Sequence, residues 1–177
     1  MKASKFVGSA VIMSVLALSA TPSFADRGDI YGGIGIDKNS YDGGVRVFGG
    51  YTIYDQFQLA GKKVDIGAEV TYIDMGSTTW GANSTGTVTE KNLGATAVGS
   101  IEVLKDTRVF ARVGFGQAQG KFSSPVWNET KTGMVPVVGV GAAYALSKNF
   151  GVRADLERLT GMYEGGTSLS ASAFLKF

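Results

Sequence analysis

The amino-acid sequence predicts an all-β protein, an eight-stranded antiparallel up-and-down barrel. Eight stretches of the chain alternate between apolar and polar or small residues, which is the pattern of strands with two unlike faces. Gly is frequent, with 26 residues, and Pro is rare, with 3. The stretches follow one another through turn-like connections without helical periodicity between them. An even number of such strands lets the first and the last pair and close the sheet.

The eight predicted strands are, in chain order, about 29–37, 44–53, 64–73, 92–104, 107–117, 134–146, 150–159 and 167–177. Their apolar faces carry, strand by strand, Ile30, Ile34 and Ile36; Val45, Val47, Tyr51 and Ile53; Val64, Ile66, Ala68, Val70 and Tyr72; Leu93, Ala95, Ala97, Ile101 and Val103; Val109, Ala111, Val113 and Phe115; Val138, Val140, Ala142 and Tyr144; Phe150, Val152, Ala154 and Leu156; Leu169, Ala171, Ala173, Leu175 and Phe177. The sixth strand is the weakest. Its Pro136 fits only near the strand's start, because proline cannot donate to a ladder.

The predicted connections differ in length at the two ends of the barrel. Those after odd-numbered strands are longer, at about 38–43, 74–91, 118–133 and 160–166. Those after the fourth and sixth strands are short, at about 105–106 and 147–149, and the one after the second, at about 54–63, is longer. We therefore expect a short-turn end and a long-loop end.

Residues 1–25 have the layout of a secretory signal peptide. Lys2 and Lys5 precede an apolar run from about Phe6 to Leu18, and Ser23-Phe24-Ala25 offers a cleavage site after Ala25. The run is shorter than the roughly 20 residues of a membrane-spanning helix. We expect residues 26–177 to form a single domain.

Composition excludes several classes of function. Without the signal peptide the chain has 15 basic and 15 acidic residues, so no basic excess predicts nucleic-acid binding. The chain contains no Cys and no His, which removes the thiolate and imidazole ligands of most metal sites and the commonest general base. We expect neither a cofactor, nor a metal site, nor catalysis.

Alternation alone leaves open whether the apolar face meets lipid outside the barrel or a core inside it, as in a secreted lipocalin-like carrier. The strands have about the 9–11 residues that a tilted transmembrane strand needs. Aromatic residues lie near the strand ends on the apolar face, as in interfacial girdles: Tyr51, Tyr144, Phe150 and Phe177 at one end, Tyr72 and Phe115 at the other. The polar face is rich in Gly, as a crowded lumen requires. These observations favour an outer-membrane barrel over the soluble alternative.

Charged residues at mid-strand all belong to the polar face. An Arg facing lipid at mid-depth costs roughly 2–4 kcal/mol, so we place these side chains in the lumen: Arg46, Glu69, Arg112, Arg153, Asp155 and Glu157, with Glu102 and Arg108 nearer the short-turn end. One interpretation is an ion-pair network that fills the barrel. The other is a gated polar channel in which the pairs exchange partners.

The chain resembles the small eight-stranded outer-membrane barrels of Gram-negative bacteria, the OmpA-type and opacity-protein group. The resemblance is most specific in GVGAAYALSKNFGVRADLERL (139–159) and in the terminal LKF, which is similar to the aromatic-ended signal read by the barrel-assembly machinery. It implies residence in the bacterial outer membrane and an assembly role for Phe177. Group members serve envelope integrity, adhesion or slow solute passage, and the resemblance does not choose among these roles.

The predicted long loops are where a partner would bind. Two of them are rich in Ser, Thr and Gly and carry one Trp each, Trp80 and Trp127, which suits contact with a host or surface ligand. Arg158 lies on the lipid-facing side near the outer end and is placed to meet lipopolysaccharide phosphates. We expect a monomer with a structural or adhesive role; the alternative is a narrow porin-like channel for small solutes.

Overall fold

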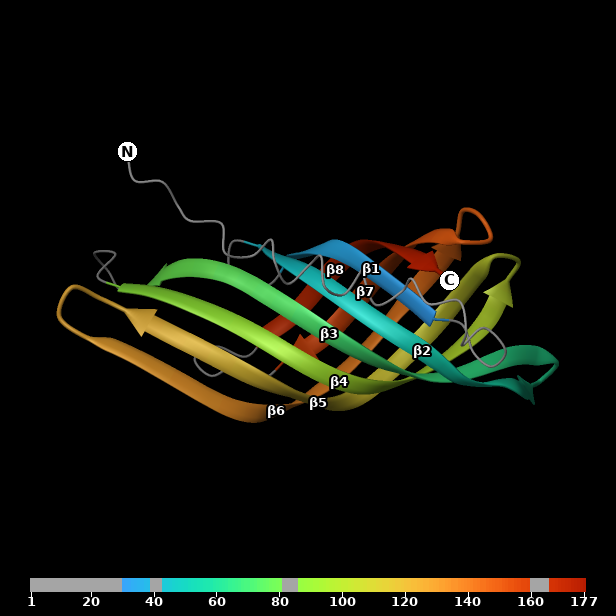
Figure 1. Cartoon of the computed structure of the whole chain (residues 1–177), viewed down its shortest axis with the longest axis horizontal. Coiled ribbons are helices and arrows are strands. Elements are labelled where there is room, and N and C mark those ends of the chain that lie inside the picture. The colour runs from blue at the N-terminus through green and yellow to red at the C-terminus, as the bar shows by residue number, and fades with distance from the viewer. Residues whose placement is uncertain (1–29, 39–42, 81–85, 160–165) are drawn as a thin grey trace.

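The computed structural model describes residues 30–38, 43–80, 86–159 and 166–177, which form one closed antiparallel barrel (Figure 1). Its strands are β1 (Ile30–Lys38), β2 (Gly44–Leu59), β3 (Lys62–Trp80), β4 (Gly86–Leu104), β5 (Thr107–Ser123), β6 (Asn128–Ala145), β7 (Phe150–Leu159) and β8 (Gly166–Lys176). Each strand pairs with its neighbours in chain order, and β8 pairs with β1. The predicted signal peptide lies outside the described residues. Within them, no helix is long and apolar enough to cross a membrane.

The terminal strand has partners along both edges. The register of β8 with β1 runs from Lys176 opposite Tyr31 to Leu169 opposite Lys38, and its other edge pairs with β7. The backbone N–H of Phe177 donates to the carbonyl of Ile30 at 2.9 Å. Closure leaves no open edge here, a condition that a sheet in lipid must meet.

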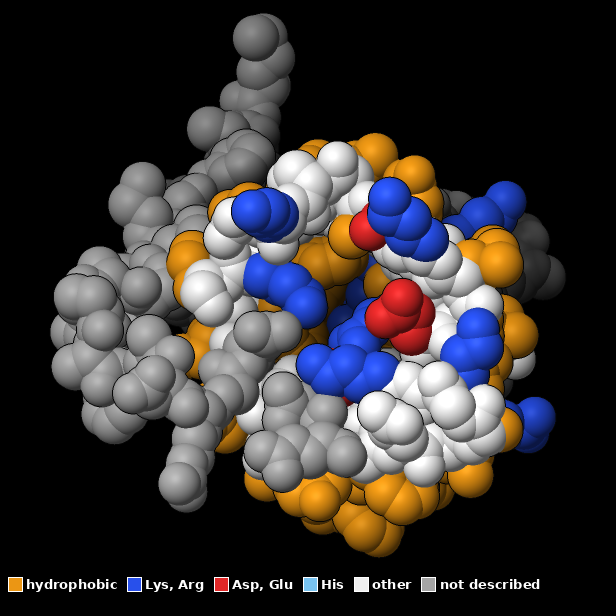
Figure 2. Space-filling view, turned by 90° about the vertical axis from the view of Figure 1, so that its right-hand side faces the viewer, with side chains coloured by type: hydrophobic (Ala, Val, Ile, Leu, Met, Phe, Trp, Pro, Cys, Tyr) orange, Lys and Arg blue, Asp and Glu red, His pale blue; other side chains and the backbone are white. Residues whose placement is uncertain are grey.

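Side chains on the outer face of the barrel are apolar, and those on the inner face are polar or small. On β5, Val113 is 60% exposed and Phe115 is 64% exposed, whereas Arg112, the residue before Val113, is 3% exposed. Seen from the end that carries the β4–β5 and β6–β7 turns, apolar side chains rim the barrel and charged ones crowd its mouth (Figure 2). An apolar outer surface of this extent requires hydrocarbon around it.

Glycines on the inner face make room for aromatic rings. A Cβ on Gly33 would lie 2.5 Å from the ring of Phe48, and one on Gly141 would overlap the ring of Phe110. Phe48 and Phe110 are almost fully buried in the lumen. The small residues of the polar face are thus explained by close approach of large neighbours.

At the long-loop end, β3–β6 extend beyond the predicted strand ends, and the two long loops are correspondingly shorter. The segments 74–91 and 118–133, expected to be loops, are largely strand: β3 continues to Trp80, β4 begins at Gly86, and β5 and β6 are separated only by residues 124–127. β2 pairs with β3 only up to Asp74, and β7 pairs with β6 only from Val137. Residues 74–80, 86–91, 117–123 and 128–134 therefore form a four-stranded extension beyond the closed barrel (Figure 1).

The extension reverses the two faces. Its outer face is polar and exposed, with Ser77, Thr79, Thr87, Lys91, Gln117, Gln119, Lys121, Ser123, Thr130 and Thr132. Its inner face contributes to an apolar cap, which we define as Ile73, Met75, Val88 and Val137 with the partly buried Phe122. This is the arrangement of a sheet whose outside meets water.

A β-bulge in β3 marks the change. The register shifts between Asp74 and Ser77, and Gly76 has φ 80°, a conformation that favours glycine. The Gly76 N–H donates to Asp74 Oδ1 at 3.1 Å, and Lys91 Nζ lies 3.3 Å from Asp74 Oδ2. The Asp74 carboxylate holds the pKa of Lys91 above its ordinary value.

The prediction of a loop at 54–63 is also wrong. β2 and β3 continue to a two-residue turn, Ala60-Gly61, in which both residues have positive φ, as a type I′ hairpin requires. Register shifts between Thr52, Tyr54 and Phe57 interrupt the alternation, so the sequence hides this strand. Pro136 lies in the middle of β6 and not near its start. The described pairing of β6 with β7 starts one residue later, at Val137, so Pro136 is on an edge of the described sheet.

Candidate functional site

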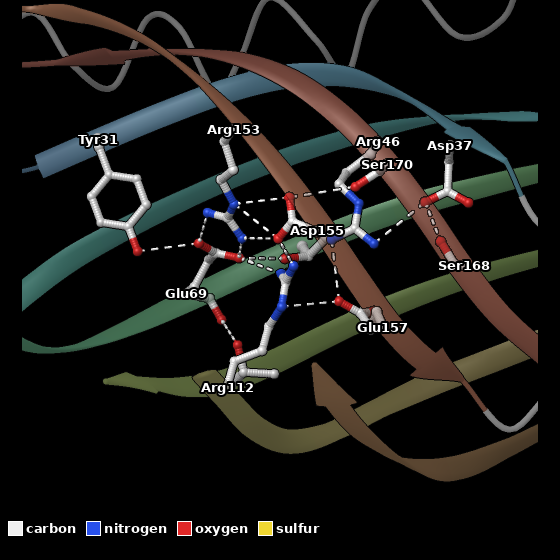
Figure 3. A network of polar contacts seen from close by, with 12 residues as sticks. Tyr31, Asp37, Arg46, Glu69, Arg112, Arg153, Asp155, Glu157, Ser168 and Ser170 are labelled. Atoms are coloured by element: carbon white, nitrogen blue, oxygen red, sulfur yellow. Dashed lines mark hydrogen bonds and ion pairs between the residues drawn. The ribbon is translucent and has the colours of Figure 1, made fainter. Parts of the chain in front are cut away.

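The described lumen of the barrel holds a network of buried charges (Figure 3). It contains all six residues that the alternation assigns to the lumen: Arg46 on β2, Glu69 on β3, Arg112 on β5, and Arg153, Asp155 and Glu157 on β7. None is more than 7% exposed. Alternate positions of β7 place three of them on one strand face, and the closed sheet brings the others within reach.

Glu69 is one centre of this network. Its carboxylate accepts from Arg153 Nη1 at 2.6 Å, from Arg153 Nη2 at 3.0 Å and from Arg112 Nη1 at 2.8 Å. The hydroxyls of Thr71 and Tyr31 each donate to it at 3.1 Å. Five donors therefore fix one carboxylate, which is the condition under which a buried charge is tolerated.

Asp155 is the second centre. Arg153 Nε donates to both of its oxygens, at 2.9 and 3.0 Å, and Arg112 Nη2 donates to Oδ1. Ser170 on β8 makes a longer contact of 3.4 Å. Arg112 and Arg153 thus each bridge Asp155 to Glu69 across the lumen.

Arg46 extends the network toward the extension. Its Nη1 lies 3.2 Å from Glu157 and its Nη2 lies 3.3 Å from Asp37, and Ser168 donates to Asp37 at 2.6 Å. Sequence reasoning missed Asp37, although it shares the inner parity of β1. Its parity indicates the inner face, but its position at the end of the predicted strand hides that it reaches the lumen.

Aromatic rings enclose Arg153. Its guanidinium carbon lies 4.3 Å from the centroid of the Phe48 ring and 4.4 Å from that of Phe110. Both contacts are within the range of cation–π attraction. The two rings also fill the space that the Gly-rich inner face leaves open.

The short-turn end of the lumen contains a smaller charge cluster. Arg108, predicted near this end, pairs with Asp65, and Lys63 Nζ lies 3.9 Å from the same carboxylate. A cavity of about 90 Å³ separates this cluster from the network, with Tyr31, Phe174 and Lys176 among its lining residues. Phe174, which breaks the alternation of the last strand, thus lines an inner space.

The arrangement joins three arginines to four carboxylates in the middle of the described lumen. The apolar cap packs between this network and the extension. No group of three Asp or Glu side chains among the described residues is arranged to hold a metal ion.

Trp127, one of the two predicted contact residues, lies at the tip of the β5–β6 hairpin. Trp127 is 58% exposed and Val126 is 95% exposed. The Trp127 ring packs against Phe122, with ring centroids 5.9 Å apart. Trp80 is the last residue of β3, opposite Gly86, and its side chain lies outside what the structure describes.

The remaining predicted residues lie on the outer face. Arg158 is exposed on β7 opposite Val138 and Thr167. Phe177 is 54% exposed beside the short turns. The aromatic residues assigned to the girdles are all exposed on the apolar surface: Tyr51, Tyr72, Phe115, Tyr144, Phe150 and Phe177.

Several solved structures share this fold. Ail, the attachment invasion locus protein of Yersinia pestis, matches with TM-score 0.61 and 16% identity over 85% of this chain and 99% of that chain. The N-terminal β-barrel domain of Pseudomonas aeruginosa OprF matches with TM-score 0.62 and 11% identity over 85% and 98%. Neisserial surface protein A matches with TM-score 0.60 and 14% identity over 85% and 97%.

No curated protein sequence matches the chain. A family model, however, matches residues 19–168, which is most of its length. The eight-stranded barrel with an apolar outer face agrees with this match, and both place the protein in the bacterial outer membrane. The chain belongs to the OmpA-like transmembrane domain family.

Proposed function

We propose that this protein acts without catalysis, as an outer-membrane scaffold that holds an adhesive surface away from the membrane. The observation that carries the proposal is the four-stranded extension, which ends in the exposed Val126 and Trp127. Short turns face the periplasm and long connections face the outside in this class of barrel. The extension is therefore extracellular, and its tip is the part of the described chain best placed to meet another surface.

The packed lumen supports a scaffold over a channel. Arg46, Arg112 and Arg153 have their charged groups engaged by carboxylates, and the apolar cap packs beyond them toward the extension. Eight strands leave an interior just wide enough for side chains to fill. A gated channel would need these pairs to separate and the cap to open together.

The comparisons support adhesion as the kind of surface role. The Yersinia protein that shares the fold is named for attachment and invasion, and one of its structures holds the heparin analogue sucrose octasulfate. For this chain we propose a surface ligand reached through the extension. Outer-membrane lipid and lipopolysaccharide would surround the monomeric barrel, with Arg158 toward lipopolysaccharide phosphates, and the barrel-assembly machinery would read Phe177.

Whole-cell adhesion tests the proposal. The chain is displayed on a non-adherent Gram-negative strain, and bacteria retained on an epithelial cell layer are counted. We expect retention to rise on expression and to fall when Trp80→Ala and Trp127→Ala are combined, while Glu102→Gln at the opposite end has no effect. Retention that expression does not raise, or that survives the double substitution, would refute the adhesive role.

Conductance tests the sealed lumen. In planar bilayers the purified protein should show little or no current, because paired charges and the apolar cap occupy the described lumen. Large steady channels that persist after repeated purification would replace the scaffold with the narrow porin-like alternative. Heat-modifiable gel mobility before reconstitution shows that the barrel is folded.

A further inference from the structure

We propose that the β5–β6 tip, residues 124–127, is a membrane-docking element that inserts into the interfacial region of an opposing anionic bilayer. This inference rests on the proposed surface-contact function and names its partner as a lipid surface. It follows from the tip's exposure, its satisfied backbone, its rigidity and the charges behind it.

The tip exposes apolar side chains where water surrounds them. Val126 is 95% exposed, Trp127 is 58% exposed, and Pro125 between Ser124 and Val126 is also exposed. The outer face of the same hairpin carries polar residues such as Gln119 and Lys121. Apart from Met134 near the barrel, which is 70% exposed, the exposed apolar side chains of this hairpin beyond the girdle lie at its tip, the point farthest from the barrel (Figure 1). Trp is the side chain that most favours the bilayer interface.

The backbone of the tip satisfies its own donors. The Ser124 N–H donates to the Trp127 carbonyl at 2.9 Å, and the Trp127 N–H donates to Ser124 Oγ at 3.0 Å. The Ser124 hydroxyl donates in turn to the Trp127 carbonyl at 2.9 Å. Pro125 has no N–H, so Val126 carries the single turn donor without a hydrogen bond to the described residues. The open Val126 N–H and the turn carbonyls would keep water or headgroup partners in the interfacial region, whereas the same groups would be costly in the hydrocarbon core.

The tip is also held in one orientation. The Trp127 ring packs against Phe122, with ring centroids 5.9 Å apart, and Phe122 belongs to the apolar cap. Below the turn, Ser123 donates to Asn128 at 2.6 Å. Insertion would therefore cost little side-chain entropy, because the ring is positioned before it meets the bilayer.

The charges behind the tip favour an anionic surface. Lys121 and Lys131 are both exposed on the hairpin, and Glu129, the hairpin's single acidic residue between 117 and 134, lies 3.6 Å from Lys131. The hairpin therefore carries one net positive charge beside its apolar point. Lysines within a Debye length of anionic headgroups are attracted to them.

Size decides between a lipid and a protein partner. A stable protein interface buries about 800 Å² on each side and takes about 20–30 residues from each partner. Four convex residues are far short of this, and they offer no groove for a partner to fill. A bilayer interface needs no complementary shape. One tip binds weakly, and many copies in one outer membrane supply the avidity.

The experiment measures Trp127 directly. Because the chain has two Trp residues, Trp80→Phe leaves Trp127 as the single reporter. This protein is embedded in phosphatidylcholine nanodiscs and mixed with liposomes of phosphatidylcholine alone or with about one-third phosphatidylserine. Emission maximum, quenching by a shallow doxyl-labelled lipid and co-flotation are recorded, with empty nanodiscs as the blank.

We expect a blue shift, shallow quenching and flotation that are stronger with phosphatidylserine and weaker at high salt. In the otherwise unchanged chain, Trp127→Ala should lower the liposome partition coefficient about tenfold. Val126→Ser should lower it severalfold, and Lys121→Gln with Lys131→Gln should remove the preference for phosphatidylserine. Gln119→Ser, on the same hairpin but away from the tip, should change nothing.

The inference is wrong if Trp127 shows neither blue shift nor quenching, or if Val126→Ser floats as the parent does. Heat-modifiable mobility confirms that each variant is folded. If Trp127→Ala abolishes cell adhesion while liposome binding is absent, the tip meets a non-lipid ligand: the inference fails and the adhesive function stands. If liposome binding is absent and adhesion also survives Trp80→Ala combined with Trp127→Ala, both fail.

Discussion

Strands β3–β6 run through two regions whose interiors are filled differently. In the membrane section the interior is ionic, with three arginines and four carboxylates joined by short contacts. In the extension the inner face carries the apolar cap, with Glu90 as a buried carboxylate on the same face of β4 as Val88. On β5 alone the inner face changes from Arg112 to Ala118 and Phe122, while the outer face changes from Val113 and Phe115 to Gln119 and Lys121.

The difference shows that the surrounding solvent determines what can hold the interior. In lipid, an apolar side chain gains nothing by turning inward, so the hydrophobic effect cannot organise the lumen. Ion pairs and hydrogen bonds are then the specific attractions left to fill it. Beyond the girdle at Phe115, water surrounds the sheet and ordinary apolar burial returns.

Glu69→Ala should have the largest effect on stability. It removes one of the two carboxylates that Arg112 and Arg153 share, and breaking a buried ion-pair network costs about 3–5 kcal/mol. We expect the free energy of unfolding in urea, measured in lipid vesicles, to fall by that amount, or folding to fail. Glu129→Ala, on the extension, should change it by less than 1 kcal/mol. A loss below 1 kcal/mol for Glu69→Ala would mean that the network does not hold the lumen.

A matched pair of arginine substitutions on β5 tests where the solvent changes. Val113→Arg places a charge on the lipid-facing surface near mid-strand and should cost roughly 2–4 kcal/mol. Gln119→Arg, six residues along the same face, should cost nothing measurable because it remains in water. Both are measured by urea unfolding in vesicles. Equal costs at the two positions would place the membrane boundary elsewhere.

Truncation in the apolar cap should loosen the extension without opening the barrel. Met75 is 4% exposed, and Met75→Ala should destabilise the extension by about 2–3 kcal/mol through lost burial and a cavity. Hydrogen exchange should accelerate at amides of β3–β6 beyond the girdle, while amides of the membrane section keep their protection. Uniform acceleration along these strands would show that the two regions unfold as one unit.

The reversal of the two faces between the membrane section and the extension explains which elements could be predicted from the sequence and which could not. The fold class, the eight strands and the assignment of Arg46, Arg112 and Arg153 to the inner face follow from parity, because lipid outside penalises any other placement. The sequence predicts loops where the extension lies because the apolar residues there occupy the other parity and are diluted by Ser, Thr and Gly. In β3 the bulge at Gly76 shifts the parity as well, so no single period describes the strand.

The contacts within the lumen could not be predicted from parity. Alternation assigns a face, but partners such as Arg46 and Glu157, which are 111 residues apart in sequence, depend on the stagger of the closed sheet. Phe48 and Phe110 alternate with outward-facing residues of β2 and β5, but nothing in their spacing indicates that they enclose the guanidinium of Arg153. Trp127 was recognised by type, whereas the turn that orients it depends on Ser124.

The smallest effect should come from the ion pair at the boundary between the two regions. Lys91 and Asp74 are 45% and 38% exposed, and pairs of this kind contribute about 0.2–1 kcal/mol, screened by salt. Lys91→Gln should therefore lower stability by that amount in low salt and by almost nothing in 1 M salt. Because the folded state raises the pKa of Lys91, its contribution is full at neutral pH and is lost only as alkaline pH rises through that pKa. A salt-independent loss in urea unfolding would mean instead that Lys91 contributes through packing over the bulge, and that the boundary is held by the apolar cap and the bulge rather than by charge.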